Sequence, residues 1–516
     1  MLRGTLSPVR RRISGAVEQP RTVVVLAVAT VLVRLVSLTR PPGADESGLL
    51  LVARAWAPGG DAVYGRYFVD RPPLLVATYR LGDALGGLTA MRVLAALACG
   101  GAVLLAARAG HLVAGRRASG WAALATAAAC TNPLIGVGSA KGELLGLPLV
   151  LGAVVLALAS VRSPSRWRAV GLAAAAGCSG ACAIGFKQSL GGGLVFTGVL
   201  LLASTVLGRL GPRRLVATVA AALAGAAVPV LLTVLWARVE GVDLDALWYA
   251  VVGFRGEASQ VLASQPHDAP LTRAGVLVLA ALGAGLVLVV GGFVVHAPGE
   301  WSDDPSLTTA VAAMLAADTA ALVVSGSYWR DYLYALVPST ALAAALLARR
   351  RPSRRGTAMR GVVTFTAVSS AVCTLGWVVL KVTAIQPYPS DDTAVALRAA
   401  AEPGDTLTVF GGRADVQLGA RMPSPYDQLW SLPMRTLDPD LQRLTALVDD
   451  PDRPTWLVEW VDFEAWTPEA GARLEAAVRA HYVEHGEACG DRPVWLARGV
   501  DRPVVVPDCR GWDSLD

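Results

Sequence analysis

The 516-residue chain is 54% hydrophobic and only 17% charged, and its mean hydropathy is +0.49. A soluble domain has about 25% charged residues, so this composition excludes a soluble cytosolic enzyme and a disordered chain, and seven cysteines are too few for a disulfide-rich secreted scaffold. The net charge of +6 divides into −11 for residues 384–516, which hold 12 Arg, no Lys and 23 acidic residues, and +17 for residues 1–383.

This division of charge predicts two parts. An excess of Arg is typical of the loops between membrane spans, and it gives no reason to expect a nucleic-acid partner. Residues 384–516 have the composition of an ordinary acidic soluble domain. We therefore expect a polytopic α-helical membrane domain at 1–383, followed by a soluble domain at 384–516.

Eleven apolar stretches between residues 22 and 383 approach the length of a bilayer crossing. Gly or Pro interrupts several of them, which membrane helices tolerate. We predict transmembrane helices at about 22–38, 88–110, 120–138, 144–160, 169–185, 191–208, 215–236, 274–295, 307–325, 332–348 and 361–383.

Basic residues set the predicted orientation, because cytoplasmic loops are enriched in Lys and Arg. With eleven spans, the Arg-rich N-terminus falls on the same side as the Arg-rich segments 116–117, 162–168, 209–214 and 349–360. The loop at 296–306 is the exception, since it has acidic residues but no Lys or Arg. No small-x-small cleavage site follows the first span, which predicts an uncleaved helix. We expect a bacterial plasma-membrane protein with a cytoplasmic N-terminus and an extracytoplasmic C-terminal domain.

The C-terminal part has its own pattern of elements. Residues 405–411, 455–460 and 493–497 have the composition of short strands. Helices are predicted near 391–401, 438–448 and 468–480. This alternation predicts a small soluble α/β domain.

Cys489 and Cys509 are the only cysteines of this domain, and outside the cytoplasm they meet an oxidising compartment. They flank the predicted strand at 493–497. They are therefore candidates for a disulfide, with two unpaired thiols as the alternative.

Charged residues gather unexpectedly in the first outer loop, residues 39–87. Asp45 and Glu46 directly follow the first span, and Arg71-Pro72-Pro73 closes the loop before the next apolar stretch. Charges at a membrane edge are costly unless they are paired or hydrated, so they are candidates for function.

In this loop the sequence resembles the GT-C glycosyltransferases of the protein O-mannosyltransferase and aminoarabinose transferase type. In that family an Asp-Glu pair follows the first span and a Lys/Arg-Pro-Pro segment closes the loop. Asp45-Glu46 and Arg71-Pro72-Pro73 match in type, order and spacing. Later segments are similar to actinobacterial family 39-like enzymes: Lys141-Gly142-Glu143-Leu144-Leu145, Phe186-Lys187-Gln188, Gly253-Phe254-Arg255, Ser327-Tyr328-Trp329 and Tyr332-Leu333. Two departures are Asp331, where many relatives have His, and Arg71, where the aminoarabinose transferases have Lys.

The resemblance implies a GT-C fold and glycosyl transfer from a polyprenyl-phosphate sugar. Lysine occurs only at 141, 187 and 381, each near an outer end of a span. A lipid-linked phosphate presents its charge at this depth, where Lys or Arg can hold it, and snorkelling to the surface is the alternative. The candidates for donor phosphate binding are Lys187, Lys141, Arg71, Arg255 and Arg330.

Four further residues are candidates for positioning the substrate: Gln188, Glu143, Tyr64 and Tyr332. Gln188 and Glu143 can hydrogen-bond phosphate or sugar, although Glu143 can equally neutralise Lys141. For Tyr332 the alternative is an aromatic anchor at the membrane interface.

The implied reaction needs a base for the acceptor hydroxyl and a positive charge for the departing phosphate. Asp45 is the predicted base, and Glu46 is expected to orient the acceptor, to assist Asp45 or to help hold a cation. The proximity of the two carboxylates predicts that one pKa of the pair is raised. The resemblance implies a single displacement with inversion.

The sequence indicates no metal site and no firm cofactor, and a divalent cation stays open. The expected partners are a polyprenyl-phosphate sugar donor, membrane lipids and a cell-envelope glycan, lipid or protein acceptor. A membrane transporter or lipid flippase is the alternative, disfavoured because no inverted repeat is found and the charges gather at the outer face. A membrane-anchored binding module would leave the first outer loop unexplained.

Overall fold

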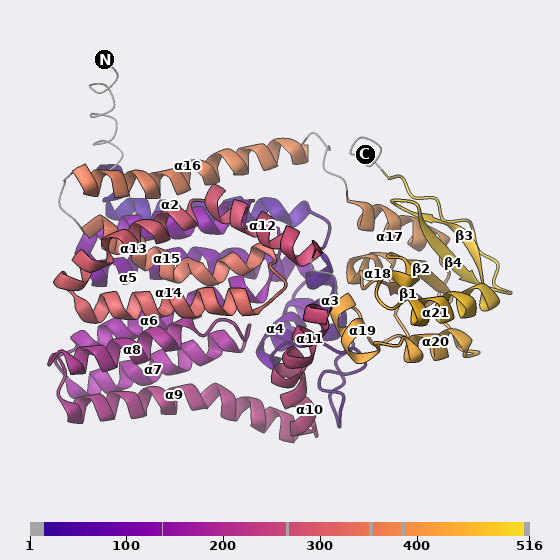
Figure 1. The fold of residues 1–516 in the computed structure, drawn as a ribbon, viewed down its shortest axis with the longest axis horizontal. Coiled ribbons are helices and arrows are strands. Elements are labelled where there is room, and N and C mark those ends of the chain that lie inside the picture. Colours follow the sequence, from indigo (N-terminus) through magenta and orange to yellow (C-terminus); the bar gives the residue numbers. More distant parts are fainter. Residues whose placement is uncertain (1–14, 137, 265–267, 350–353, 383–387, 510–516) are drawn as a thin grey trace, which may run out of the picture.

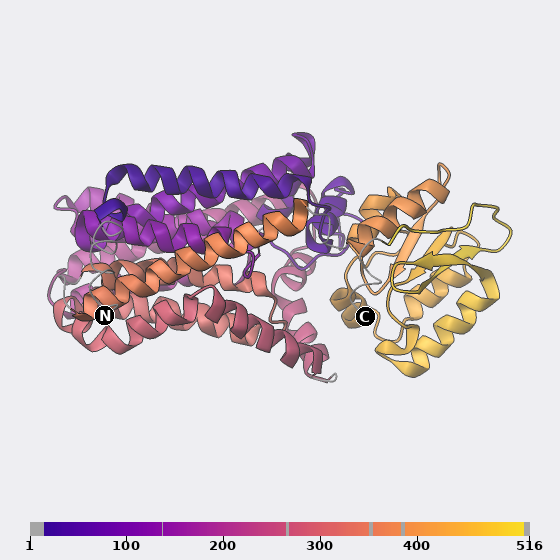
Figure 2. The ribbon, with the colours of Figure 1, turned by 90° about the horizontal axis from the view of Figure 1, so that it is seen from above.

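The computed structural model describes residues 15–136, 138–264, 268–349, 354–382 and 388–509. Long helices form a bundle, a small α/β domain lies beyond one end of it, and a layer of short helices lies between the two (Figure 1). The view from above shows the same three parts in the same order (Figure 2). The expected polytopic helical fold with a C-terminal α/β domain is confirmed.

The bundle helices arise from the apolar stretches, because a helix satisfies its own backbone hydrogen bonds without water. Among the described residues, eight helices are long and apolar enough to cross a membrane, or nine if one bent pair counts as a span. The bundle consists of α2 (Pro20–Leu35), α5 (Leu88–Thr131), α6 (Gly142–Arg162), α7 (Arg166–Ile184), α8 (Gly192–Val206), α9 (Pro212–Val239), α12 (Asp268–Gly283), α13 (Leu286–Asp303), α14 (Pro305–Val324), α15 (Val337–Arg349) and α16 (Arg354–Val382). The 3-10 helix η1 (Val36–Thr39) extends α2, and the 3-10 helix η3 (Arg330–Leu336) precedes α15.

The element α5 contains two of the expected spans. Ala114 and Gly115 have non-helical backbone angles, and Gly115 has a φ of 75°. A Cβ atom on Gly110 would lie 2.7 Å from the carbonyl oxygen of Ala118, although eight residues of continuous helix would separate the two positions by about 12 Å. The two halves of α5 therefore fold back against each other at Gly115.

Two other spans differ from a simple straight helix. The helices α12 and α13 meet at Gly285 with a bend of 72°, and α8 has only 15 residues. The expected number of eleven spans therefore stays a prediction, although each expected stretch coincides with helical structure over most of its length.

The acidic loop at 296–306, which departed from the charge rule, is neutralised by its neighbours. Asp304 accepts a hydrogen bond from Arg209 at 2.5 Å, and Asp303 pairs with Arg349 at 2.8 Å. Both arginines belong to the Arg-rich segments expected on the same side of the membrane. The acidic residues of this segment are thus neutralised by arginines that are distant in the sequence.

The middle layer comprises α3 (Ala44–Arg54), α4 (Pro73–Ala84), α10 (Leu244–Trp248), the π-helix η2 (Tyr249–Gly253) and α11 (Phe254–Ser264). Buried side chains of this layer, among them Leu49 and Tyr79, form one hydrophobic cluster with Ala414 and Leu429 of the α/β domain. The backbone N–H of Phe68 also donates to the carbonyl of Asp427 at 3.1 Å. The first outer loop and the α/β domain therefore share a core.

The α/β domain is built on a four-stranded sheet of order β1-β2-β4-β3. Strands β1 and β2 pair in parallel, with Leu407 opposite Trp456, and the other pairs are antiparallel. Its elements are α17 (Pro389–Ala400), β1 (Leu407–Phe410), α18 (Ala414–Ala420), α19 (Ser431–Leu437), α20 (Gln442–Asp449), β2 (Trp456–Glu459), η4 (Phe463–Ala465), α21 (Pro468–His481), β3 (Tyr482–Ala488) and β4 (Arg492–Ala497). The expected domain boundary between 383 and 384 lies outside the described residues.

Strand β3 was not predicted, whereas the three expected strands are confirmed as β1, β2 and β4. The sequence of β3 is YVEHGEA, and its central residues are partly or fully exposed. It lies at an edge of the sheet, where charged residues are common because they discourage pairing with other chains. A polar edge strand lacks the apolar signal of a buried one.

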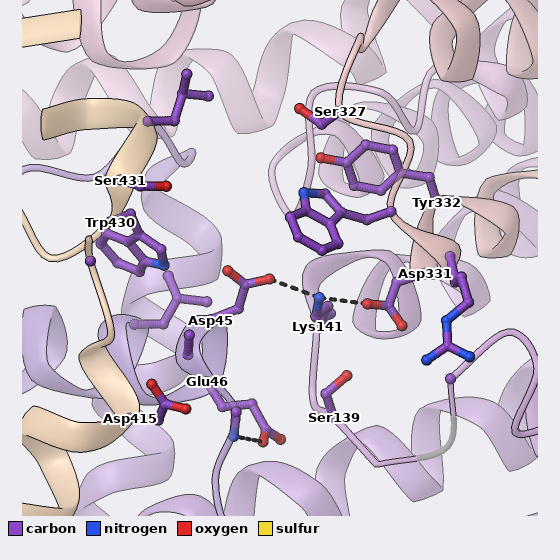
Figure 3. Close-up of a pocket in the computed structure, with 18 of the residues that line it drawn as sticks. Asp45, Glu46, Ser139, Lys141, Ser327, Asp331, Tyr332, Asp415, Trp430 and Ser431 are labelled. Carbon is purple, nitrogen blue, oxygen red and sulfur yellow. Dashed lines mark hydrogen bonds and ion pairs between the residues drawn. The ribbon is translucent and has the colours of Figure 1, made fainter. Parts of the chain in front are cut away.

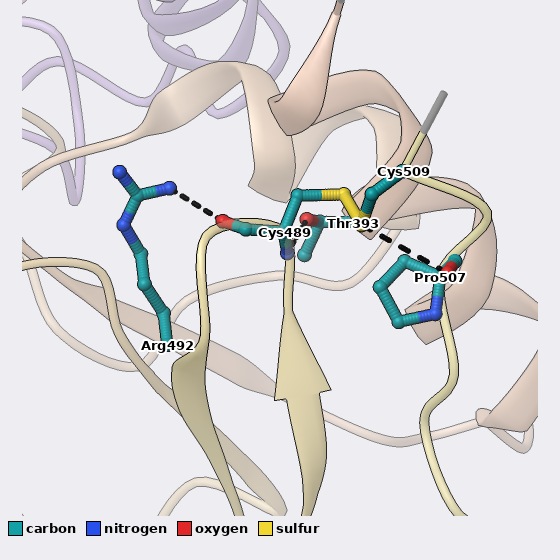
Figure 4. Close-up of a disulfide and its surroundings, with 5 residues drawn as sticks. All are labelled: Thr393, Cys489, Arg492, Pro507 and Cys509. Atoms are coloured by element: carbon teal, nitrogen blue, oxygen red, sulfur yellow. Dashed lines mark hydrogen bonds between the residues drawn. A yellow bond between two sulfur atoms is a disulfide. The ribbon is translucent and has the colours of Figure 1, made fainter. Parts of the chain in front are cut away.

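A disulfide joins Cys489, after β3, to Cys509 near the end of the described chain (Figure 4). The backbone N–H of Cys489 donates to Oγ1 of Thr393 in α17 at 3.1 Å, and Arg492 donates to the Cys489 carbonyl at 2.6 Å. These contacts attach the C-terminal segment to both the sheet and α17.

Replacing Cys489 and Cys509 together with Ser is expected to lower the free energy of unfolding by roughly 3 kcal/mol, because the disulfide closes a loop of about 20 residues in the unfolded chain. Thermal unfolding of the purified full-length proteins measures the difference. Peptide mapping without reductant should recover the two cysteine peptides linked. Complete labelling of both thiols in the unreduced protein would contradict the bond.

Candidate functional site

A cavity of about 810 Å³ opens where the bundle, the middle layer and the α/β domain meet. Its charged lining comprises nine basic and six acidic residues. They are Arg40, Asp45, Glu46, Asp70, Arg71, Lys141, Glu143, Lys187, Arg255, Arg273, Arg330, Asp331, Arg413, Asp415 and Arg435. The cavity thus brings together most of the candidates named from the sequence.

Asp45 lies in the first turn of α3, and its side chain is 40% exposed. Its carboxylate accepts a hydrogen bond from Nζ of Lys141 at 2.8 Å, and the same ammonium contacts Asp331 at 2.5 Å. Figure 3 shows Lys141 between the two carboxylates. Asp331, which stands where many similar enzymes have His, therefore has a structural role: it shares the ammonium of Lys141 with the candidate base Asp45.

The expectation that the carboxylate pair raises a pKa is wrong for Asp45. Desolvation in the cavity raises the pKa of Asp45, but the charges of Lys141 and Arg71 lower it by more, so the net pKa lies below its usual range. Asp45 is consequently held as a carboxylate, and its ion pairs weaken as the pH falls.

Glu46 is 1% exposed and is already occupied by protein donors. Its Oε2 accepts from Arg92 at 2.8 Å, and its Oε1 accepts from the backbone N–H of Ala140 at 2.7 Å. Arg92, near the start of α5, also donates to the carbonyls of Ser37 and Pro41 at 2.9 and 3.1 Å. We therefore propose that Glu46 positions the first turn of α3 rather than contacting the substrate.

A second group of charges lines the same cavity. Lys187 forms a short ion pair with Glu143 and lies over the ring of Tyr332, with Nζ 3.9 Å from the ring centroid. The carboxylate of Asp70 holds both Arg71, at 2.5 Å, and Arg255, at 2.6 Å. Each of these basic residues thus has an acidic partner that fixes its position.

Two of the substrate-positioning candidates do not line this cavity. Gln188 donates to the carbonyls of Asp70 and Val251 at 2.9 and 3.1 Å. The buried hydroxyl of Tyr64 donates to the carbonyl of Arg71. Both side chains therefore hold the backbone around Asp70 and Arg71. Arg330 does line the cavity, and its side chain has no ion pair with the described part of the chain.

The sequence did not identify the residues that the α/β domain contributes. The same cavity as that of Asp45 is lined by Arg413, Asp415, Trp430, Ser431 and Arg435. Figure 3 shows Asp415, Trp430 and Ser431 on the side of the α/β domain. The pair Gly411 and Gly412, at the end of the predicted strand 405–411 and directly after β1, is the one local signal for them, because ligand sites gather at the carboxyl ends of parallel strands.

The approach of the α/β domain requires a glycine in α3. A Cβ atom at Gly48 would collide with the ring of Trp430. Across the cavity wall, Arg413 donates to both carboxylate oxygens of Asp415, at 2.9 and 2.5 Å. The α/β domain thus packs directly against α3, and one of its own ion pairs lines the cavity.

No group of three or more His, Cys, Asp and Glu side chains suitable for a metal ion occurs among the residues that the structure describes. Where Asp45 and Asp331 come together, the ammonium of Lys141 lies between them.

The buried ion pair between Glu46 and Arg92 is expected to contribute to the stability of the protein. Glu46→Gln is expected to destabilise the protein by about 3 kcal/mol or more, because it leaves the guanidinium of Arg92 buried without its counter-charge. Asp45→Asn removes a partly exposed carboxylate and should leave the melting temperature almost unchanged. Thermal unfolding of both variants in the same detergent measures the contrast. Equal melting temperatures for Glu46→Gln and the parent would contradict the structural role of the pair.

No family model matches this sequence, and no curated protein matches it. Among solved structures, the chain is similar to ArnT from Cupriavidus metallidurans without ligand, with 16% identity, a TM-score of 0.56 and coverage of 92% of this chain and 97% of ArnT. The TM-score is 0.59 for the same protein bound to undecaprenyl phosphate, with the same identity and coverage. The oligosaccharyltransferase of Archaeoglobus fulgidus in its apo form is 12% identical with a TM-score of 0.48, and the match covers 93% of this chain and 75% of that one.

At 16% identity, the likeness to ArnT is a likeness of fold. It extends over nearly the whole of both chains, so it includes the α/β domain as well as the bundle. The GT-C fold, expected from the first outer loop, is therefore the fold of this protein.

Proposed function

We propose that the protein is an integral membrane glycosyltransferase that moves a sugar from a polyprenyl-phosphate donor to an acceptor hydroxyl at the outer face of the membrane. One observation carries the proposal. In a GT-C fold, the partly exposed carboxylate of Asp45 faces the same cavity as Lys141, Lys187, Arg71 and Arg255. A base and a cationic phosphate site are the two elements that this transfer needs.

The position of the cavity supports a lipid-linked donor. It lies at the end of the bundle, next to the first turns of α3 and α6 and to the α/β domain. A polyprenyl chain stays in the bilayer, so its phosphate reaches this depth and no further. Support also comes from ArnT, the fold relative that was solved with undecaprenyl phosphate bound.

The ion pairs suggest how the site passes from rest to reaction. In the resting protein Lys141 neutralises Asp45, which makes Asp45 a weak base. A donor phosphate attracts the same ammonium, and this weakens the hold of Lys141 on Asp45. The pKa of Asp45 then rises toward its ordinary value, and the carboxylate can accept the proton of the acceptor hydroxyl. The base is thus activated by donor binding.

The departing lipid phosphate carries the charge that the transfer releases. Lys187 and Arg71 line the same cavity and are held in place by Glu143 and Asp70. Fixed cations stabilise developing negative charge without having to reorganise during the reaction. We propose that these two residues, with Arg255 beside them, hold the leaving phosphate.

Loss of the base should remove turnover without unfolding the protein. Asp45→Asn is expected to reduce the rate by ~10²–10⁴-fold, the usual contribution of a general base. Purified protein is incubated with polyprenyl-phosphate mannose, arabinose and glucose, and sugar release is measured. The matched control is Asp61→Asn, which changes an exposed carboxylate of the same loop.

Two outcomes would contradict this assignment. Near-normal turnover of Asp45→Asn would show that Asp45 is not the base, and loss of donor binding instead of turnover would make it a binding residue. A transporter or flippase, the rival hypothesis, releases sugar from no donor of the panel.

The proposal also requires the α/β domain to lie outside the cytoplasm. The start of α2 and the α/β domain lie at opposite ends of the bundle (Figure 1), and the Arg-rich loops predict that the end with the start of α2 is cytoplasmic. Alkaline phosphatase fused after residue 516 should therefore be active. A fluorescent protein that folds only in the cytoplasm should be dark at the same position. The opposite pair of results would place the cavity on the wrong side for an outer-face acceptor.

A further inference from the structure

Two further arginines of the cavity have no acidic partner among the described residues. Arg273 lies in α12, within the bundle, and Arg435 lies in α19, within the α/β domain. Neither forms a hydrogen bond or ion pair with any residue in the described part of the chain. By contrast, the four cations assigned above to the donor phosphate, Lys141, Lys187, Arg71 and Arg255, all have acidic partners in the same cavity.

Aromatic rings hold both guanidinium groups in place. The guanidinium carbon of Arg273 lies 4.9 Å from the ring centroid of Trp329, and that of Arg435 lies 5.5 Å from the ring centroid of Trp466. Stacking on a ring occupies the face of a guanidinium and leaves the N–H groups at its edge available to an acceptor. In addition, the Nε atoms of both arginines are buried without a hydrogen-bond partner.

The two positive charges also act on each other. Burial lowers the pKa of Arg435, and the charge of Arg273 lowers it further. Two cations from different domains thus repel each other, and neither has an ion pair with a carboxylate of the described residues. An oxyanion that accepts from both would remove the repulsion and supply the missing acceptors.

We propose that Arg273 and Arg435 form a second anion-binding site, which takes a phosphate-type oxyanion of a bound substrate and bridges the bundle and the α/β domain. The inference deepens the proposed function and rests on it for the identity of the substrate. Two substrates can carry such a group: the lipid donor, through its own phosphate, and an acceptor that bears a phosphate. The experiment distinguishes these two sources.

The first measurement uses inorganic phosphate and the full-length protein in detergent. Thermal unfolding is followed as phosphate is added at constant ionic strength. The parent should show a saturable rise in melting temperature, because a ligand that binds only the folded state stabilises it. Arg273→Gln and Arg435→Gln should each lose the part of this rise that comes from the second site, because the cations proposed for the donor phosphate remain in place. Arg435→Lys, which keeps the charge, should lose less of it.

The matched control is Arg473→Gln, which changes an exposed arginine of α21 that does not line the cavity. It should respond to phosphate as the parent does. The control also accounts for the general stabilisation of proteins by phosphate salts. A cooperative transition of each variant in phosphate-free buffer shows that it is folded. An equal rise in the parent, both Gln variants and the control would overturn the site.

The second measurement is the affinity for undecaprenyl phosphate, determined by thermophoresis with the same proteins. An affinity reduced tenfold or more in both Gln variants assigns the site to the phosphate of the lipid donor. An unchanged lipid affinity, together with a reduced phosphate response, assigns it to an anionic acceptor. Neither measurement depends on turnover, so the anion site and the transferase activity can each fail without the other.

Discussion

The carboxylate of Glu46 and the guanidinium of Arg92 meet inside the protein, where α3 begins beside the end of the bundle. Arg92 also donates to the carbonyls of Ser37 and Pro41. Its side chain therefore joins the segment that follows α2 to the first turn of α3. Glu46 in turn binds the N–H of Ala140, next to Lys141. The position of Asp45 relative to Lys141 therefore depends on a neighbouring buried ion pair that does not itself need to touch the substrate.

Many charged side chains line this cavity, and several of its basic residues form ion pairs with acidic ones. Lys187 has Glu143, Arg71 and Arg255 share Asp70, and Lys141 lies between Asp45 and Asp331. Buried charges without partners are costly, and these acidic partners reduce the cost of placing the basic residues in the cavity. The cations Lys141 and Arg71 in turn lower the pKa of Asp45 and keep its carboxylate ionised.

The α/β domain belongs to this arrangement. Its Ala414 and Leu429 are buried in the same cluster as residues of the first outer loop, and the ring of Trp430 packs where Gly48 leaves room. A cavity with one wall on each domain suits a reaction in which one substrate arrives from the bilayer and the other from outside. Arg435, held by Trp466, extends the cationic lining onto the outer wall.

Much of this protein could be predicted from sequence alone. Apolar stretches specify helices in a membrane, because hydropathy and length are local properties, and three strands of the α/β domain carried the usual apolar signal. The spacing of Asp45-Glu46 and Arg71-Pro72-Pro73 indicated the fold and the loop that carries the site. Strand β3 could not be predicted because it is a polar edge strand. Its stability comes from pairing with β4 rather than from an apolar sequence of its own.

The roles of individual charges were decided only by the tertiary structure. Adjacent carboxylates in a sequence predict a raised pKa, yet Arg92, 46 residues away, neutralises Glu46, and Lys141 lowers the pKa of Asp45. Gln188 and Tyr64, expected at the substrate, support the backbone instead. No sequence pattern around Arg435 marked it as a site residue, because its proposed role depends on Arg273, which lies in another domain. Composition and periodicity determine where a helix forms, whereas the energy of a charge depends on the partners that long-range folding brings to it.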